Sequence, residues 1–285
     1  AFLRDVYLAK TRDANIGLSG VAGGRAMYRH NIHAHTTVDR SPEELHKIGL
    51  EELKGIRGEM TQIARHVGHA GDLESFLESV RRDPANFFTT REDLLKNAEL
   101  LVGKATVKLP EWFGILPKTA LVVKPVEQFQ EKNEAAARYF RPPTDLSRPG
   151  VYYINTYKPE SRPRFSMTSL AVHEGVPGHH LQIALALENK ELPLFRRNAG
   201  FTSYVEGWAL YTERLGDEMG LYQDDLSRLG MLSDQSLRAA RLVVDTGIHA
   251  KGWSRDKAIE FMKSNTPMSQ EEIEAEVDRY TVWPG

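Results

Sequence analysis

A short segment of this chain, residues 170–182, sets the strongest limit on what the chain can fold into. Within eight positions of an otherwise apolar helical pattern it concentrates three histidines and a glutamate, namely His173, Glu174, His179 and His180. Burying such groups costs free energy unless each finds a partner, and one metal ion satisfies several of them at once. In the H-E-x-x-H motif, two histidines on one helical face bind zinc and the glutamate beside the first activates water. The segment therefore predicts a helix-borne site for one zinc ion, with Glu174 as general base.

The spacing of the candidate ligands departs from that motif. His173 and His179 are six residues apart, and at about 100° per residue a regular helix would turn them to different faces. Proline removes a helical hydrogen bond and glycine tolerates unusual dihedrals, and both residue types lie between the histidines: Gly175, Pro177 and Gly178. We therefore predict a distorted turn at 175–178 whose two extra residues bring His179 to the second ligand position. A turn with three extra residues would instead bring His180 to the second ligand position. If His180 is not a ligand, it is expected to hydrogen-bond a ligand or to contact substrate.

The third ligand is expected from the next helical segment. Glu206 lies among apolar residues there, and a carboxylate in such surroundings needs a partner. Its alternative reading is a buried carboxylate paired with Arg214 or Arg241. Glu213 lies seven residues further, on the same helical face, where it could orient a ligand histidine. Three protein ligands and an open water position are typical of catalytic zinc, whereas structural sites are closed by four.

Further residues are candidates for the remaining tasks of a peptidase. The oxyanion that develops on a scissile carbonyl needs a hydrogen-bond donor, and His249 and then Tyr280 are the candidates, although His249 could equally cap a helix or pack. Tyr152, Tyr153 and Asn155 are expected in an edge strand that holds a peptide substrate in extended form.

The remaining pattern predicts a mainly α fold, a multi-helix zincin-like catalytic domain with a small mid-chain β-sheet. Branched and aromatic residues indicate strands at 119–123 and 150–155. Apolar periodicity and capping residues indicate helices at 42–67, 72–82, 90–106, 167–188, 199–219, 225–251, 254–263 and 269–280. The sequence shows no convincing domain boundary, so residues 1–285 are expected to form a single helical catalytic domain.

Composition excludes several other classes of protein. A formal net charge of -2 offers no basic face for nucleic acid, and no apolar run reaches the roughly 18 residues that a membrane span needs. The absence of cysteine excludes thiolate metal sites and leaves His, Asp and Glu as strong ligands. A second metal site at His30, His33 and His35 is not expected, because no carboxylate is adjacent. The start, Ala1-Phe2-Leu3-Arg4, lacks both an initiator Met and a signal-peptide core.

The string His173-Glu-Gly-Val-Pro-Gly-His-His-Leu-Gln182, followed by Glu206-Gly-Trp-Ala-Leu-Tyr and by Asp245-Thr-Gly-Ile-His-Ala-Lys-Gly-Trp253, resembles the bacterial family known as domain of unknown function 885. That family resembles a distant branch of the gluzincin metallopeptidases. The resemblance implies zinc and peptide hydrolysis, and it favours His179 over His180 as second ligand. Family members are usually about twice this length, which implies that the chain is a C-terminal half.

These observations predict a zinc metallopeptidase that cleaves short peptides. The metal-dependent hydrolysis of non-peptide amides or esters is the first alternative, and a non-catalytic binding fragment is the second. The expected partners are a peptide or small amide substrate, and either the missing N-terminal half or a second copy of the chain. A bacterial location, periplasmic, secreted or cytoplasmic, is all that the sequence indicates.

Overall fold

The computed structural model describes residues 1–11 and 15–285. The chain divides into two compact units, each described here by itself. The terminal unit comprises Ala1–Glu59 and Gln235–Gly285, and the central unit comprises Met60–Asp234. Both boundaries fall inside long helices, α2 (Pro42–His66) and α9 (Asp225–His249). The expectation of a single domain concerns how the units are joined, and it stays a prediction.

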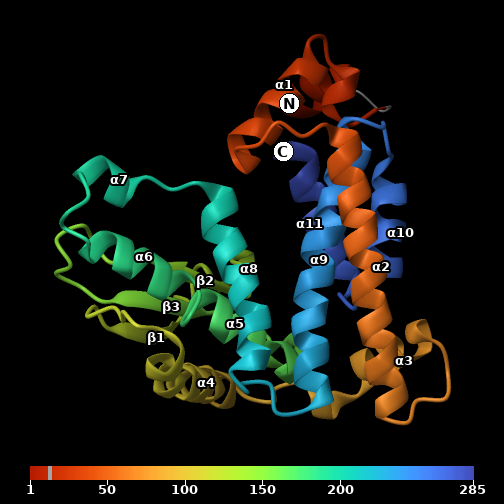
Figure 1. Ribbon diagram of the computed structural model, residues 1–285. Helices are drawn as coiled ribbons and strands as arrows, with labels where there is room; N and C mark the ends of the chain where they lie inside the picture. The colour runs from red at the N-terminus through yellow and green to blue at the C-terminus, as the bar shows by residue number, and fades with distance from the viewer. Residues whose placement is uncertain (12–14) are drawn as a thin grey trace. The chain divides into compact units, whose positions relative to one another are not determined.

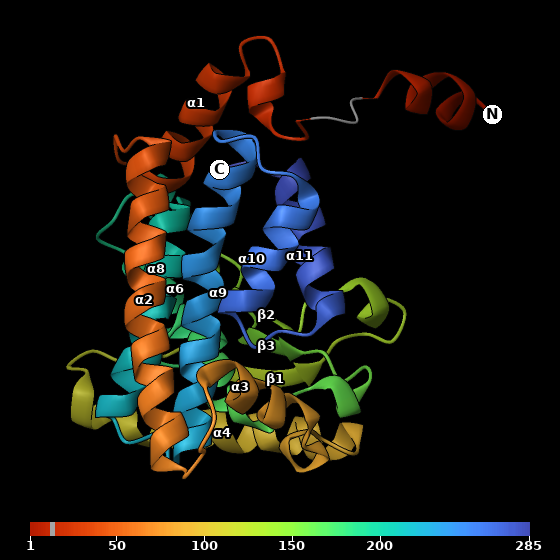
Figure 2. The ribbon, with the colours of Figure 1, turned by 90° about the vertical axis from the view of Figure 1, so that its right-hand side faces the viewer.

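The terminal unit is helical, and several of its helices begin at a serine whose hydroxyl caps the first turn. It contains α1 (Gly24–Thr36), parts of α2 and α9, α10 (Arg255–Asn265) and α11 (Gln270–Val282), with α10 and α11 side by side in Figure 2. The Ser269 hydroxyl accepts a hydrogen bond from the Glu272 amide, and the Glu272 carboxylate accepts one from the Ser269 amide. This reciprocal capping satisfies two amide groups that a helix start otherwise leaves without partners. Ser41 and Glu44 cap the start of α2 in the same way.

The central unit contains the β-sheet, made of β1 (Leu121–Pro125), β2 (Ala137–Phe140) and β3 (Gly150–Ile154). The strand order is β1-β3-β2, with β3 parallel to β1 and antiparallel to β2 (Figure 1). Strand β3 is therefore the central strand, and its backbone is paired on both sides. The expectation that residues 150–155 form an edge strand for substrate is wrong, because both edges belong to the other two strands.

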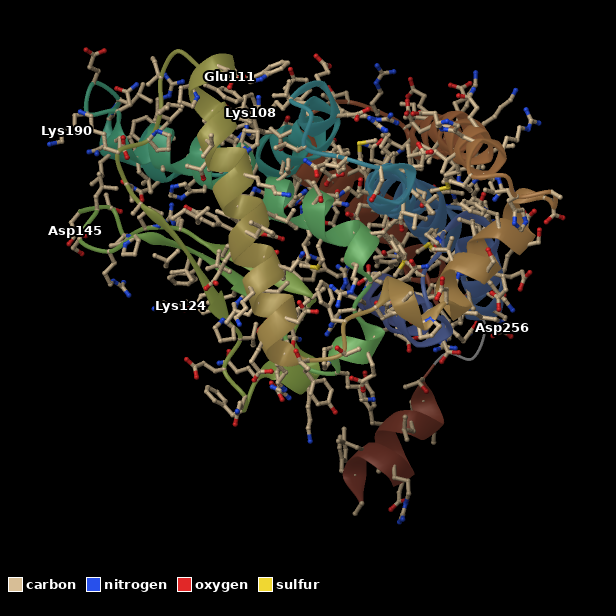
Figure 3. The ribbon with its side chains drawn as sticks, turned by 90° about the horizontal axis from the view of Figure 1, so that it is seen from below. Lys108, Glu111, Lys124, Asp145, Lys190 and Asp256 are labelled. Atoms are coloured by element: carbon tan, nitrogen blue, oxygen red, sulfur yellow. The ribbon has the colours of Figure 1, made fainter. Side chains whose placement is uncertain are left out.

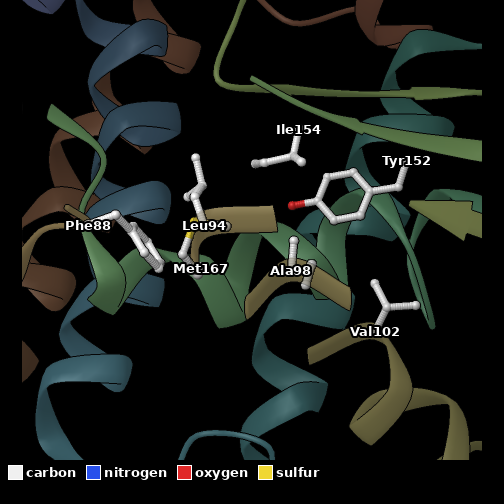
Figure 4. Close-up of a cluster of buried hydrophobic side chains, with 8 residues drawn as sticks. Phe88, Leu94, Ala98, Val102, Tyr152, Ile154 and Met167 are labelled. Atoms are coloured by element: carbon white, nitrogen blue, oxygen red, sulfur yellow. The ribbon is translucent and has the colours of Figure 1, made fainter. Parts of the chain in front are cut away.

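Helices and sheet of the central unit share an apolar core. Its helices are α3 (Leu73–Arg82), α4 (Arg91–Trp112), α5 (Met167–Glu174), α6 (His179–Glu188), α7 (Leu194–Asn198) and α8 (Thr202–Glu218). Tyr152 and Ile154 of β3 pack on Leu94 of α4 and Met167 of α5 (Figure 4). Each such buried side chain stabilises the fold by about 1.5–3 kcal/mol. The outer side of α4 is charged, as Lys108 and Glu111 show in Figure 3.

The fold confirms a mainly α architecture with a small sheet. Most predicted helices begin and end within a few residues of their expected positions. The predicted helix 167–188 is in fact two helices, α5 and α6, separated by the turn expected at 175–178. Helices α1 and α7 and strand β2 were not predicted from the sequence. None of the helices in the described ranges has the length and apolar character that a bilayer crossing requires.

Candidate metal centre

The turn between α5 and α6 is built around glycine. Helix α5 ends at Glu174 and α6 begins at His179. The Gly178 amide donates to the Val172 carbonyl (3.0 Å), so the chain folds back on the last turn of α5. A Cβ added at Gly178 would lie 2.1 Å from the carbonyl oxygen of His173 and 2.3 Å from that of Val172. Only glycine fits against these backbone atoms, and this close approach lets two histidines six residues apart face one point.

Three predicted ligands converge there. One donor atom from each of His173, His179 and Glu206 lies within 4.8 Å of the others. The carboxylate of Glu206 stands 3.4 Å from Nε2 of His173 and 3.6 Å from Nε2 of His179. Donors held about 2.0–2.1 Å from one zinc ion at tetrahedral angles lie about 3.3 Å apart. The spacing and the donor set, two imidazoles and a carboxylate, therefore fit zinc.

A buried carboxylate orients the first histidine. The Nδ1 of His173 donates to Oε1 of Glu213 at 2.7 Å, and the Glu213 side chain is 0% exposed. This bond fixes the tautomer of the ring and directs Nε2 towards the other two donors. Glu213 reaches it because seven residues of α8 separate it from Glu206, about two helical turns. The orienting role predicted for Glu213 is thus matched by its geometry.

His180, the alternative second ligand, points to other partners. Its Nδ1 accepts a hydrogen bond from the Tyr139 hydroxyl (3.0 Å), and its Nε2 donates to the Thr119 carbonyl (3.0 Å). Burial lowers the pKa of His180 and favours the neutral ring that these two bonds require. A Cβ at Gly150 would lie 2.5 Å from the Tyr139 hydroxyl and 2.6 Å from Nδ1 of His180, so a glycine is needed there. The geometry favours His179 as the ligand.

Glu206, the third candidate ligand, differs from the two histidines in its exposure to solvent. The side chain of Glu206 is 53% exposed, so the alternative reading of a buried carboxylate is wrong. Glu174, the expected general base, is half-buried at the end of α5. The indole of Trp208 donates to the Pro177 carbonyl (2.9 Å) and ties α8 to the turn. An exposed carboxylate among the candidate ligands is compatible with the approach of water and substrate.

The expected oxyanion donors, His249 and Tyr280, belong to the terminal unit. Nδ1 of His249 accepts from the Leu18 amide (3.1 Å), and its Nε2 donates to the Tyr280 carbonyl (2.9 Å). The Tyr280 hydroxyl donates to Glu276 and accepts from Arg241. Arg241 also bonds to Glu276, at 2.8 Å. The catalytic role of His249 and Tyr280 stays a prediction that would require these bonds to be exchanged.

The expected substrate strand has a structural role instead. Tyr152 and Asn155 are 0% exposed, and the Asn155 amide donates to the carbonyls of Glu131 (2.7 Å) and Glu134 (3.1 Å). Tyr153 lies under the guanidinium of Arg138. The residue that the sequence analysis missed is Tyr139 of β2, whose ring centroid is 6.3 Å from that of His179. A tyrosine in a four-residue strand carries no motif that would have identified it.

Comparison with known proteins places this geometry in context. A family model described as "Bacterial protein of unknown function (DUF885)" matches residues 1–285. A solved structure from Colwellia psychrerythraea, described as a "putative lipoprotein", is 34% identical with a TM-score of 0.93, and the match covers 98% of this chain and 48% of that one. A "putative lipoprotein of unknown function" from Shewanella oneidensis, 19% identical with a TM-score of 0.79, shares the fold over 98% of this chain and 52% of its own. The chain thus spans about half the length of these structures, and no curated protein matches it.

Proposed function

The chain belongs to the bacterial family of unknown function DUF885, and we propose that it is a zinc-dependent hydrolase that cleaves short peptides. The observation that carries this proposal is the convergence of His173, His179 and Glu206 at separations that suit one zinc ion. The His173–Glu213 bond supports it, since ligand histidines almost always donate their second nitrogen to such a partner. Three donors leave a coordination position for the reaction.

The chain's own residues divide the catalytic tasks. Zinc, when bound, would act as a Lewis acid that polarises the scissile carbonyl and acidifies the attacking water. Glu174 directly follows a ligand in sequence and is half-buried, so its carboxylate can accept the proton of that water and pass it to the leaving nitrogen. Glu213 holds the His173 ring, and the turn at 175–178 holds His179.

Peptides are proposed as substrates because the His-Glu segment resembles that of gluzincin peptidases. The same centre would also hydrolyse a non-peptide amide or an ester, and the substrate panel below separates these reactions. The names of the solved neighbours, both described as putative lipoproteins, favour a periplasmic or secreted site of action over the cytoplasm.

Metal analysis combined with Glu174→Gln tests the proposal. The purified chain is expected to retain about one zinc per molecule after dialysis, and to hydrolyse a panel of short peptides. Glu174→Gln should keep the zinc and lose at least about 100-fold in kcat, because general-base catalysis typically contributes 10²–10⁴-fold. Glu218→Gln, an exposed position of α8, is the matched control and should change neither quantity.

Three results would count against the proposal. If the wild-type chain binds zinc no more tightly than a His173→Ala/His179→Ala double variant, these histidines do not form a zinc site. If Glu174→Gln leaves the turnover of the zinc-loaded protein unchanged, Glu174 is not the general base. If the zinc-loaded wild-type protein shows no turnover, the chain is a binding fragment and not a hydrolase.

A further inference from the structure

Helix α6 begins with two neighbouring buried histidines that have different partners. His179 and His180 form the start of its first turn, and adjacent residues of a helix point about 100° apart. The ring of His179 lies against that of His173 in the candidate metal centre, with centroids 4.7 Å apart. The ring of His180 instead contacts the sheet, along which α6 lies (Figure 1). The position of His179 therefore depends on how this first turn is held.

His180 contacts all three strands or the segments that lead into them. Its Nε2 donates to the carbonyl of Thr119, just before β1, at 3.0 Å. Because a carbonyl only accepts, Nδ1 of the neutral ring is left to accept from the Tyr139 hydroxyl of β2, also at 3.0 Å. Gly150, the first residue of β3, lies against this second bond, since an added Cβ would stand 2.5 Å from the hydroxyl and 2.6 Å from Nδ1. Both ring nitrogens are thus bonded, and the backbone of β3 prevents the bonded pair from moving towards it.

The Tyr139 side chain contacts both histidines. Its hydroxyl bonds to His180, and its ring centroid lies 6.3 Å from that of His179, with the ring planes tilted by 31°. Tyr139 is paired with Tyr152 in the β2–β3 register, and Tyr152 is completely buried in the core of the central unit. Residues directly opposite each other in paired strands share a face of the sheet. The group that contacts both histidines is therefore carried by a paired strand, which positions a side chain more precisely than a loop does.

The far end of α6 is attached to the same segment by a separate group. The Glu188 carboxylate accepts hydrogen bonds from the amides of Lys118 (2.9 Å) and Thr119 (2.7 Å), and from the Thr119 hydroxyl (2.7 Å). Glu188 follows His180 by about 12 Å along the helix axis. Of these two attachments, the one at His180 adjoins a candidate ligand. Comparing them separates the placement of that ligand from the general stability of α6.

We propose, building on the zinc site proposed above, that His180 is a positioning residue for His179. By bridging the Tyr139 hydroxyl and the Thr119 carbonyl, it holds the first turn of α6 on the sheet, so that the neighbouring imidazole stays at the metal centre. In this arrangement His180 neither binds the metal nor takes part in the chemical step.

Zinc affinity, measured by competition with a chromogenic chelator, tests this role. His180→Ala should lower the affinity by about 10–100-fold, the typical effect of losing a group that orients a ligand. His180→Gln keeps a donor for the Thr119 carbonyl and should recover part of the loss. Tyr139→Phe removes one hydrogen bond but keeps the ring, so it should fold normally and lower the affinity by about 3- to 10-fold. With cobalt in place of zinc, the visible spectrum should change in His180→Ala, because a displaced His179 alters the coordination geometry.

Glu188→Gln is the matched control, because it weakens the other attachment of the same helix. It should lower the urea concentration of half-unfolding and leave zinc affinity and the cobalt spectrum unchanged. If it instead lowers zinc affinity as much as His180→Ala does, any attachment of α6 suffices and the inference is wrong. Unchanged zinc affinity in both His180→Ala and Tyr139→Phe would also overturn the inference, while leaving the hydrolase proposal intact.

A measurement on the metal-free chain keeps this test separate from that of the zinc site. With isotope-labelled histidine, a nuclear Overhauser effect between the rings of His173 and His179 is expected in the wild type, because their centroids are 4.7 Å apart. The effect should persist in Glu188→Gln and disappear in His180→Ala. This comparison decides the role of His180 even if the wild-type chain binds no zinc, a result that would overturn the proposed function instead. If the effect persists in His180→Ala, the turn at 175–178 positions His179 without His180 and the inference is wrong.

Discussion

Replacing Gly178 by alanine tests the geometric basis of the centre. The added methyl would lie 2.1 Å and 2.3 Å from the carbonyl oxygens of His173 and Val172, whereas real Cβ atoms essentially never approach within 3.0 Å. The overlap with each oxygen is about 1 Å, and the obstacles are backbone atoms that cannot rotate away. Overpacking in a well-packed interior costs about 1–3 kcal/mol. We expect Gly178→Ala to lower the free energy of unfolding by about 3 kcal/mol, the upper end of this range.

The same substitution should weaken the metal site more than it weakens the fold. Relief of the clash requires the turn to move by about 1 Å, whereas zinc tolerates ligand distances within about 0.2 Å. Zinc affinity, measured by competition with a chromogenic chelator, should fall at least about 100-fold. Urea unfolding, followed by circular dichroism, gives the stability change.

Gly103 of α4 provides a matched control for this experiment. A Cβ at Gly103 meets no atom within 4 Å, and the residue lies inside a helix. Gly103→Ala should therefore raise stability by about 0.5–1 kcal/mol and leave zinc affinity unchanged. If Gly178→Ala instead unfolds at the wild-type urea concentration and binds zinc normally, the close approach of this turn is not what brings the ligands together.

Two further predictions concern the carboxylates of Glu213, which is buried, and Glu276, which is partly buried. Glu213→Gln keeps the shape but removes the charge beside His173, so zinc affinity should fall about 10–100-fold; an unchanged chelator titration would contradict this. Burial raises the pKa of Glu276, but a hydrogen bond from Arg279, the charge of Arg241 and the Tyr280 hydroxyl outweigh it and lower the pKa to about 2. A carboxyl whose pKa is lowered on folding stabilises the protein above its ordinary pKa of 4.5 and loses that effect as the pH falls towards 2. Glu276→Gln should thus cost about 2 kcal/mol at pH 7, after allowance for solvent screening, and almost nothing at pH 2. A cost in urea unfolding that does not vary with pH would refute this account.

Local signals made most of the helices predictable. Ser41 with Glu44, and Ser269 with Glu272, place a hydroxyl and a carboxylate three residues apart, and both pairs cap helices as expected. These starts depend on interactions within one turn of chain, which a sequence records directly. Helix α1 was missed because it begins at a glycine and holds polar residues in place of a clear apolar stripe.

The sheet was harder to predict, because strand order depends on contacts between distant segments. Residues 150–154 have the branched and aromatic character of a strand, but that character does not distinguish a central strand from an edge. Strand β2, only four residues long, pairs with β3 and takes the edge position that the sequence analysis gave to β3. For this reason Tyr139 was missed, although it bonds to the residue beside a candidate ligand.

The three candidate metal donors could be predicted because histidine and glutamate side chains are concentrated where the helical pattern fails. A run of apolar helix interrupted by Gly175, Pro177 and Gly178 would be unfavourable if it carried no function. The structure uses the interruption to direct His173 and His179 to one point. Any side chain at 178 would meet the carbonyls of the preceding turn. The glycines and the proline that interrupt the helix therefore also form the turn that brings the two histidines together.

The two carboxylates of α8 discussed above, Glu206 and Glu213, differ in their exposure to solvent. Glu206 and Glu213 lie on one face of the helix, two turns apart, and residue type alone does not distinguish them. The side chain of Glu206 is 53% exposed and that of Glu213 is 0% exposed. A carboxylate that remains in water can bind an ion and still admit substrate, whereas a buried one needs a permanent partner and finds it in the His173 ring. Because α8 passes from the surface into the core within two turns, one helix provides both a candidate ligand, Glu206, and the carboxylate that orients another candidate ligand, His173.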